Sequence, residues 1–254
     1  MKGPIRNHVA IERDFPLRLL ELTLPTPEEN LALDEALLDE AEASGEPRET
    51  LRLWEPAGPL VVVGRSSQLA AEVQEERCRE LAIPILRRSS GGAAIVTGPG
   101  CLMYALVLSL EIRPALRAID AAHHFVLGAI AGALQRQGVA AEHRGTSDLT
   151  LGNRKFSGNS VRVRREHLLY HGTLLYDFPL ERIADCLRMP PRQPDYRDGR
   201  VHEQFVTNLP LSRDTLRHAL VEAWPLEGTY AHWPHKRVAA LVASKYSQPE
   251  WKLF

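Results

Sequence analysis

Cysteine is scarce in this chain. Its 254 residues include three, Cys78, Cys101 and Cys186, and no two of them form a CxxC pair. An odd and widely spaced set of this kind fits free thiols in a reducing compartment. We therefore expect a cytoplasmic protein.

The chain also lacks an excess of charge of one sign and any long apolar run. Its formal net charge is -1, so there is no overall basic field to attract nucleic acid. No stretch approaches the roughly 20 apolar residues of a membrane span. The opening residues MKGPIRNHVAIERDF contain no apolar signal-peptide core. We expect neither nucleic acid nor a membrane as a partner.

The remaining composition is ordinary for a globular protein, with 44% hydrophobic and 25% charged residues. A length of 254 residues allows one large domain or two small ones. The one proline-rich stretch, PPRQP at 190–194, is interpreted as a surface connection. We predict a single domain over residues 1–254, with a core at about 17–252 and residues 1–15 at its periphery.

The most unusual stretch is residues 87–104, RRSSGGAAIVTGPGCLMY. The guanidinium group of arginine can donate two parallel hydrogen bonds to the oxygens of a carboxylate or a phosphate. Glycines let a ligand approach the backbone closely. The apolar pairs at 85–86 and 95–96 resemble strand ends, so the segment is predicted to be a loop at one end of a sheet. It is neither a Walker loop nor a GxGxxG fingerprint. The plain alternative is a tight turn with two solvated arginines.

Helix signals are clearest at residues 26–45. Thr26 is the candidate N-cap, Pro27 occupies the first helical position, Glu29 completes a capping box and Gly45 is a plausible stop. The acidic residues of this helix are interpreted as its solvated face; they are Asp34, Glu35, Asp39 and Glu40.

The other segments alternate between strands and helices. Strands are expected at 17–22 (an edge strand), 51–54 and 60–63 (a hairpin), 102–110, 139–144, and 148–151 and 155–157 (a hairpin about Gly152-Asn153). Two more strands are indicated by Val161, Val163, Leu168-Leu169 and Leu174-Leu175. Helices are expected at 70–82, 119–137, 180–187, 214–224 and 236–247, with 190–206 irregular. This pattern favours an α/β or α+β fold with a mixed sheet flanked by helices.

Lys155 is the most informative single residue after the glycine-rich loop. It lies between a Gly-Asn turn and Phe156-Ser157-Gly158, where a lysine held in place could neutralise charge that develops in phosphoryl or acyl transfer. Taken alone, it could equally be an exposed strand lysine. Asp148 could bind Mg²⁺ or a ribose hydroxyl, or simply cap a turn.

Two further side chains are candidates. His171, in His-Gly-Thr, could present its ring beside a backbone gap or could be an ordinary hydrogen-bonded histidine. Cys101 is the best placed thiol, but a catalytic thiolate needs a nearby base or cation, and small buried cysteines are common. Arginines 162, 164 and 165 are interpreted as a polar strand face.

Taken together, the motifs resemble the lipoate–protein ligase family. RRSSGGAA, SDLTLGNRKFSGNS and YHGTLL carry the resemblance, and NLALDEALL, LWEPAGPLVVVGRSSQ and KYSQPEW extend it. The set keeps the family order from about residue 17 to 252. The resemblance implies the class II synthetase-like catalytic fold shared by biotin and lipoate ligases.

The resemblance also implies site residues. Lys155 matches the family's essential lysine, and Asp148 matches an acidic residue of the nucleotide site, with a weaker implication of a Mg²⁺ ligand. The positions implied to hold ATP or the acyl-adenylate are Arg88, Gly91, Gly92, Ala93, Ala94, Ile95, Val96, Asp148 and Lys155. The positions implied to line the lipoyl pocket are Ser90, Gly91, His171, Gly172 and Lys155.

Three departures from the family pattern lie near this site. Ala93 replaces a usual third glycine, Thr97-Gly98 replaces a usual His-Asp, and Cys101 replaces a frequent asparagine. They leave the acyl chain open between lipoate and octanoate. The chain stops near KYSQPEW, so we expect it to lack the C-terminal accessory domain of longer ligases, which some relatives supply as a separate chain.

Three functions compete on this evidence. The first is an ATP- and Mg²⁺-dependent ligase that forms lipoyl-AMP or octanoyl-AMP and transfers the acyl group to a lysine of a lipoyl carrier domain, of the glycine cleavage H protein or 2-oxoacid dehydrogenase E2 type. The second is an acyltransferase that uses a cysteine thioester, with Cys101 as the first suspect. The third is a non-catalytic module that binds an acyl group or a carrier.

Overall fold

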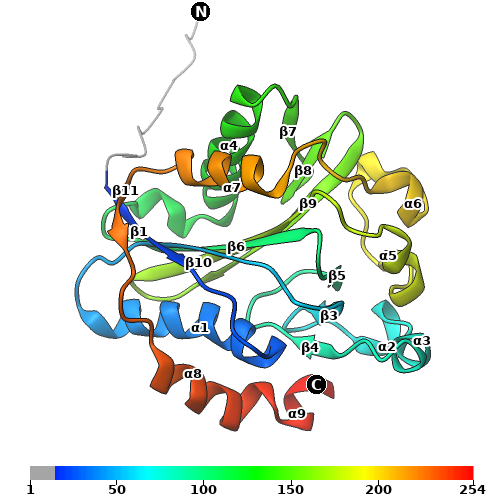
Figure 1. The fold of residues 1–254 in the computed structure, drawn as a ribbon, viewed down its shortest axis with the longest axis horizontal. Coiled ribbons are helices and arrows are strands. Elements are labelled where there is room, and N and C mark those ends of the chain that lie inside the picture. The colour runs from blue at the N-terminus through cyan, green and yellow to red at the C-terminus, as the bar shows by residue number, and fades with distance from the viewer. Residues whose placement is uncertain (1–14, 254) are drawn as a thin grey trace, which may run out of the picture.

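The strands between residues 15 and 253, the part of the chain that the computed structural model describes, form two sheets. The larger sheet has the order β11-β1-β2-β6-β10-β9-β8-β7, and the smaller has the order β4-β3-β5 (Figure 1). The larger contains β1 (Leu17–Glu21), β2 (Thr50–Trp54), β6 (Cys101–Ser109), β7 (Ala141–Arg144), β8 (Asp148–Leu151), β9 (Arg154–Val163), β10 (His167–Leu175) and β11 (Leu226–Thr229). The smaller contains β3 (Leu60–Val63), β4 (Ile85–Arg87) and β5 (Ile95–Thr97).

Both sheets are mixed. In the larger sheet β1 runs parallel to β11 and β2, whereas the pairs from β2 to β7 are antiparallel. In the smaller sheet β3 is parallel to β4 and antiparallel to β5. The predicted mixed sheet flanked by helices is confirmed.

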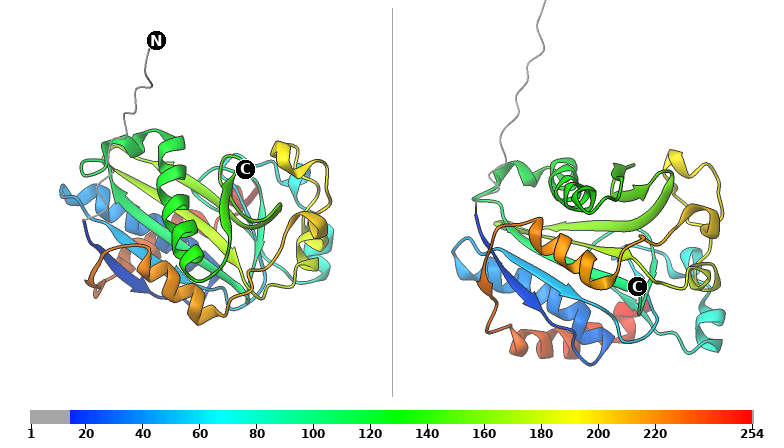
Figure 2. Two further views of the ribbon diagram at one scale, coloured as in Figure 1. Left: turned by 90° about the horizontal axis from the view of Figure 1, so that it is seen from above. Right: turned by 45° about the horizontal axis from the view of Figure 1, so that its top comes forward.

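Helices cover both faces of the larger sheet (Figures 1 and 2). Helices α4 (Ile119–Arg136) and α7 (Arg213–Glu222) lie on one face, and α1 (Pro27–Ser44) and α8 (His235–Leu241) lie on the other. Each face has its own apolar cluster. The remaining helical segments are α2 (Leu69–Glu72), α3 (Glu75–Glu80), η1 (Pro114–Arg117), α5 (Glu181–Cys186), η2 (Asp195–Arg197), α6 (His202–Phe205), η3 (Val242–Tyr246) and α9 (Pro249–Leu253).

Helix α1 begins and ends where its sequence predicts. Thr26 is the N-cap and forms a capping box with Glu29, and Gly45 ends the helix in the left-handed conformation. The prediction of a solvated acidic face is wrong for Asp34 and Glu35, which are 4% and 3% exposed. The helix is enclosed by the sheet on one side and by α8 and η3 on the other, so two of its sides are buried.

Several other predicted elements are confirmed. The strand expected at 102–110 is β6, the helix expected at 119–137 is α4, and the Gly152-Asn153 hairpin joins β8 to β9. The predicted peripheral position of residues 1–15 falls, for 1–14, outside the described residues. Within the described part, no helix combines the length and the apolar composition needed to cross a bilayer.

Five structural predictions differ from the structure. Strands β2 and β3 do not form a hairpin, because the Pro56–Pro59 connection carries the chain from the larger sheet to the smaller one. Strand β1 is not at the edge, because β11 pairs with it. The helix expected at 70–82 is split into α2 and α3 by Val73, whose backbone is extended and bridges to Leu187. The strand expected at 155–157 continues to Val163, and 190–206 contains η2 and α6.

The buried carboxylate of Glu35 joins α1 to the C-terminal segment. It accepts hydrogen bonds from Lys245 at 2.8 Å, from the Tyr246 hydroxyl at 2.7 Å and from Arg162 at 2.7 Å. Burial alone would raise the pKa of Glu35, but these hydrogen bonds outweigh it and hold the pKa below its usual value.

Glu35→Gln is expected to lower the free energy of unfolding at neutral pH by about 1.5–3 kcal/mol, since hydrogen bonds to a charged group are lost. A carboxyl group whose pKa is lower in the folded state than in the unfolded state stabilises the fold at pH values above its unfolded-state pKa. That stabilisation is lost as the pH falls through the folded-state pKa. The difference from wild type should therefore shrink as the pH falls below 4.5. Urea unfolding at several pH values tests this, with the exposed Glu46→Gln as the control. A difference that stays constant down to acid pH would contradict it.

Candidate active site

A cavity of about 350 Å³ lies where the two sheets meet. Loop 88–94 of the smaller sheet forms one side, strands β9 and β10 form another, and residues 190–197 lie across it. A second cavity, of about 120 Å³, shares Lys155 and residues 93–95 with the first and is lined mainly by apolar side chains. The two cavities therefore adjoin along a shared wall that includes Lys155.

The structure brings most of the predicted site residues together. Those that line the larger cavity are Arg88, Gly92, Ala93, Ala94, Ile95, Asp148, Lys155, His171 and Gly172. Val96 lines the smaller cavity. Ser90 and Gly91 line neither, but the side chain of Ser90 and the carbonyl of Gly91 hydrogen-bond to side chains that do.

Lys155 is held in place by its neighbours. Its Nζ lies 2.6 Å from Asp148 Oδ1, and their side chains are 27% and 10% exposed. The other oxygen of Asp148 accepts a 2.7 Å hydrogen bond from the hydroxyl of Tyr196. Gly158 makes room for the lysine, because a Cβ there would lie 3.0 Å from its Nζ. The simple alternative of a freely exposed strand lysine is therefore wrong.

Arg88 is buried beneath the glycine-rich loop. Its guanidinium donates to the carbonyls of Gly91 at 2.5 Å, Ala93 at 3.0 Å and Val62 at 3.2 Å. Burial lowers the pKa of Arg88 to about 10, so the group stays charged at neutral pH. The alternative of solvated arginines is wrong here: Arg88 ties the loop to β3.

The same loop is tied to both sheets. Ser67 donates to the carbonyl of Gly92 at 3.0 Å from the β3 side, and Ser160 of β9 donates to the carbonyl of Gly91 at 2.9 Å. Gly64 allows this close packing, because a Cβ there would lie 1.9 Å from the Gly92 carbonyl oxygen. The loop thus spans the junction that forms the cavity.

A chain of buried polar groups reaches the cavity from α1. Arg52 Nη1 lies 2.5 Å from Asp34 Oδ1. The other carboxylate oxygen of Asp34, Oδ2, lies 3.4 Å from Nδ1 of His171. On the far side of the His171 ring, Nε2 lies 2.5 Å from the Ser90 hydroxyl. Since a carboxylate only accepts, Nδ1 carries the proton and Ser90 donates to Nε2. This chain fixes the orientation of the His171 ring at the cavity wall.

Cys101 does not meet the requirements of a nucleophile. Its side chain is fully buried at the start of β6, with Sγ 4.0 Å from Met103 Sδ. Burial raises the pKa of Cys101 to about 12, so it remains a thiol at neutral pH. None of the three cysteines, all within the described residues, lines either cavity.

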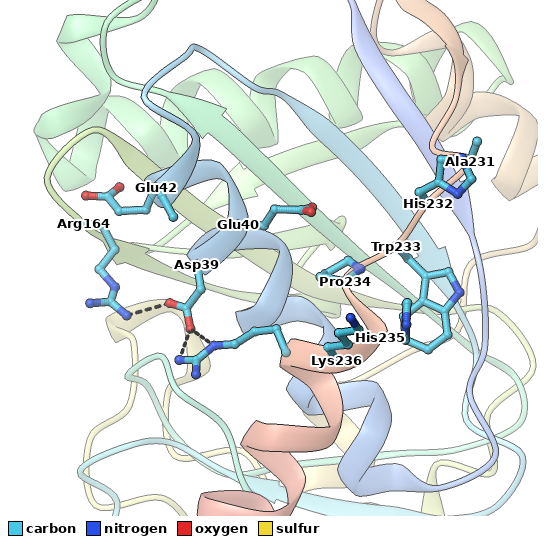
Figure 3. A pocket seen from close by; sticks show the side chains of 12 residues that line it. Asp39, Glu40, Glu42, Arg164, Ala231, His232, Trp233, Pro234, His235 and Lys236 are labelled. Atoms are coloured by element: carbon cyan, nitrogen blue, oxygen red, sulfur yellow. Dashed lines mark hydrogen bonds and ion pairs between the residues drawn. The ribbon is translucent and has the colours of Figure 1, made fainter.

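A larger and more open cavity, of about 890 Å³, lies between α1 and residues 231–237 (Figure 3). Its most evident contacts are ion pairs of Asp39 with Arg164 and Arg237. It contains none of the predicted site residues, so the smaller pair of cavities is the candidate active site.

Comparison with known families decides the identity of this fold. The family described as lipoyl protein ligase A/B catalytic domain matches residues 26–223. The chain belongs to this family. The match covers every predicted site residue from Arg88 to Gly172, and it ends before β11, α8 and α9.

Individual members of the family are also similar to the chain. It is 31% identical over 166 residues to a putative lipoate-protein ligase A of Aeropyrum pernix, covering 65% of this chain and 60% of that protein. It is 30% identical over 160 residues to a probable lipoate-protein ligase A of Mycoplasma pneumoniae, covering 63% of this chain and 45% of that protein. The chain thus spans about half the length of the curated relatives it matches.

Solved structures confirm the expected fold. One is a bi-partite lipoate protein ligase of Thermoplasma acidophilum, studied with its E2 lipoyl domain, with a TM-score of 0.78, 22% identity and coverage of 94% of this chain and 96% of that one. Another is a lipoate-protein ligase A bound with ATP, with a TM-score of 0.78, 22% identity and coverage of 94% and 99%. A third, a putative lipoate protein ligase of T. acidophilum with bound lipoic acid, has a TM-score of 0.78 and 21% identity.

Sequence reasoning missed three residues of this catalytic domain. Asp34 was assigned to the solvated face of α1, although it faces His171. Tyr196 and Arg197 lie in the stretch expected to be irregular, yet Tyr196 bonds Asp148 and Arg197 lines both cavities. The sequence feature that could have marked this stretch as part of the site is its arginine content, since residues 188–200 include four arginines.

Gly64→Ala is expected to displace the glycine-rich loop, because its Cβ would overlap the Gly92 carbonyl. Overpacking of this kind costs typically 1–3 kcal/mol. Amide hydrogen exchange should accelerate at residues 88–94 in the variant. Gly58→Ala is the matched control, since a Cβ there meets nothing within 4 Å. Unchanged exchange in Gly64→Ala would show that the loop does not depend on this contact.

Proposed function

We propose that this chain is a lipoate–protein ligase that activates lipoate, or octanoate, with ATP and transfers the acyl group to a carrier lysine. The observation that carries the proposal is Lys155, which is held by Asp148 and lines both cavities. Family membership supports it, as do the lipoic acid and the ATP bound by two proteins of the same fold.

In the first step, a carboxylate oxygen of the acid attacks the α-phosphorus of ATP. An oxygen–phosphorus bond forms, the bond to the β-phosphate oxygen breaks, and pyrophosphate leaves. Lys155 is placed to meet the negative charge that grows on the α-phosphate oxygens, because its ammonium is already fixed before the reaction. The predicted adenylate positions from Arg88 to Val96 would enclose the product.

In the second step, the amine of a carrier lysine attacks the acyl carbon. The carbon–oxygen bond to AMP breaks, and the amine loses a proton as the amide forms. We expect the carrier to be a lipoyl domain of the glycine cleavage H protein or the 2-oxoacid dehydrogenase E2 type. The E2 lipoyl domain studied with the bi-partite archaeal ligase supports this class, and the two-part nature of that ligase supports a separate accessory chain.

Mg²⁺ would accompany ATP in this site. Among residues 15–253 no group of three His, Cys, Asp or Glu side chains could hold a metal ion by itself. Mg²⁺ is often held by one or two carboxylates together with substrate phosphates. Asp34 and Asp148 line the cavity, and Asp34 is paired with buried Arg52, so Asp148 is the proposed ligand. When bound, the ion would offset phosphate charge.

The thioester alternative requires a reactive thiol beside Lys155. The buried, protonated Cys101 does not provide one. The three free cysteines of the chain are typical of a reducing compartment, which supports the predicted cytoplasmic location.

Lys155→Ala is expected to lower the single-turnover rate of acyl-AMP formation by about 10²–10³-fold, because one preorganised electrostatic partner of the transition state is removed. Lys155→Arg should rescue poorly, since a planar fork does not replace a compact ammonium. Acyl-AMP can be trapped with hydroxylamine and quantified in purified protein. The exposed Lys236→Ala is the control for loss of a lysine. A wild-type rate in folded Lys155→Ala would refute the proposed role.

Cys101→Ser is expected to retain acyl transfer to a carrier within about tenfold of wild type, since adenylation needs no protein nucleophile. Carrier mass should increase in the variant when ATP and lipoate are supplied. Two results together would establish the thioester route instead. A folded Cys101→Ser protein would no longer modify the carrier, and the wild-type protein would transfer the acyl group without ATP.

A further inference from the structure

Arg197 stands out among the buried arginines. It is 4% exposed and lines both cavities. Buried Arg52 and Arg113 pair with carboxylates, and Arg88 binds three backbone carbonyls of its own loop and strand. Arg197 resembles Arg88 in having no ion pair with a carboxylate among residues 15–253, but it has one backbone carbonyl partner where Arg88 has three.

The guanidinium of Arg197 is nevertheless held firmly on one side. Its Nε donates to the Arg200 carbonyl at 2.9 Å, and Nη2 lies 3.4 Å from His202 Nδ1 and 3.3 Å from Met189 Sδ. His202 donates from Nε2 to the Arg188 carbonyl, which leaves Nδ1 free to accept. The remaining nitrogen, Nη1, has no partner within the described part of the chain.

The guanidinium of Arg197 lies over the aromatic ring of Phe205. The Arg197 Cζ lies 4.6 Å from the centroid of the Phe205 ring, a distance at which the ring face attracts a cation. The neighbouring Tyr196 bonds Asp148, so the η2 turn is attached to the Lys155–Asp148 pair. Arg197 is thus a preorganised cation on the side of the cavity formed by η2 and α6.

The charges around this cavity favour a polyanion. Four cationic side chains line it, and its two carboxylates are each paired, Asp148 with Lys155 and Asp34 with Arg52; the four are Arg88, Lys155, Arg192 and Arg197. Burying an arginine without an anion costs free energy, and burial lowers the pKa of Arg197. A bound phosphate would offset that cost through charge-assisted hydrogen bonds from the guanidinium fork.

We propose that Arg197 binds the triphosphate tail of ATP, and the pyrophosphate that leaves, in the cavity that it lines together with Lys155. The inference rests on the proposed function and adds a residue that the family motifs do not include. Lys155 would meet the α-phosphate, whereas Arg197 would meet the β- and γ-phosphates. Release of pyrophosphate would then require this contact to break.

Titration calorimetry with ATP, AMP, inorganic pyrophosphate and lipoate tests the proposal. In Arg197→Gln, affinity for ATP and for pyrophosphate should fall about 10- to 100-fold, since charge-assisted hydrogen bonds are lost. Affinity for AMP and lipoate should stay within threefold. Arg197→Lys should recover part of the affinity, because it keeps the charge but not the fork. Arg182→Gln, which removes the same charge from a side chain of α5 that is 39% exposed and lines neither cavity, is the matched control.

The outcomes separate this inference from the proposed function. If wild type makes lipoyl-AMP but Arg197→Gln binds ATP and pyrophosphate normally, the inference fails and the function stands. An equal loss for AMP and ATP, or a loss for lipoate alone, would also overturn it. If wild type makes no acyl-AMP yet binds pyrophosphate through Arg197, the function fails and the inference stands.

Discussion

The site depends on the burial of one guanidinium, that of Arg88. An ion removed from water needs compensating dipoles, and here the carbonyls of Gly91, Ala93 and Val62 provide them. The loop must therefore curl around the arginine, which fixes its position relative to β3. Two serine hydroxyls, from Ser67 and Ser160, then attach the loop to the smaller and the larger sheet. The cavity is the space that this arrangement encloses.

Support for the loop extends through the C-terminal segment, beyond the residues that the family match covers. Arg87, the residue before Arg88, donates to the carbonyl of Trp251 at 3.0 Å, and the Trp251 indole donates to the Arg87 carbonyl at 2.9 Å. Lys245 and Tyr246 of the same segment bind Glu35 of α1. Helix α1 thus connects to the loop from two directions, through Asp34 to His171 and through Glu35 to the C-terminal residues.

Local signals in the sequence were sufficient where the interactions are local. The capping box at Thr26 and the Gly152-Asn153 turn predicted their elements well, because each is formed within a few residues. The burial of Asp34 and Glu35 could not be predicted, because their partners lie at least 18 positions away and come from four elements, β2, β9, β10 and η3. Arg197 was missed for a similar reason: its position follows from contacts with His202 and Phe205 in an irregular stretch. The roles carried over from the family remain predictions, whereas the proximity of those residues is now a structural fact.

The central claim is that a carboxylate attacks the α-phosphorus of ATP in this cavity. Lipoate labelled with ¹⁸O in both carboxylate oxygens tests it directly, with hydroxylamine as the acyl acceptor so that no carrier is needed. The account predicts AMP that contains one ¹⁸O atom, transferred from the acid when the acyl carbon is released. Acyl transfer without ATP, or AMP without the label, would contradict the account.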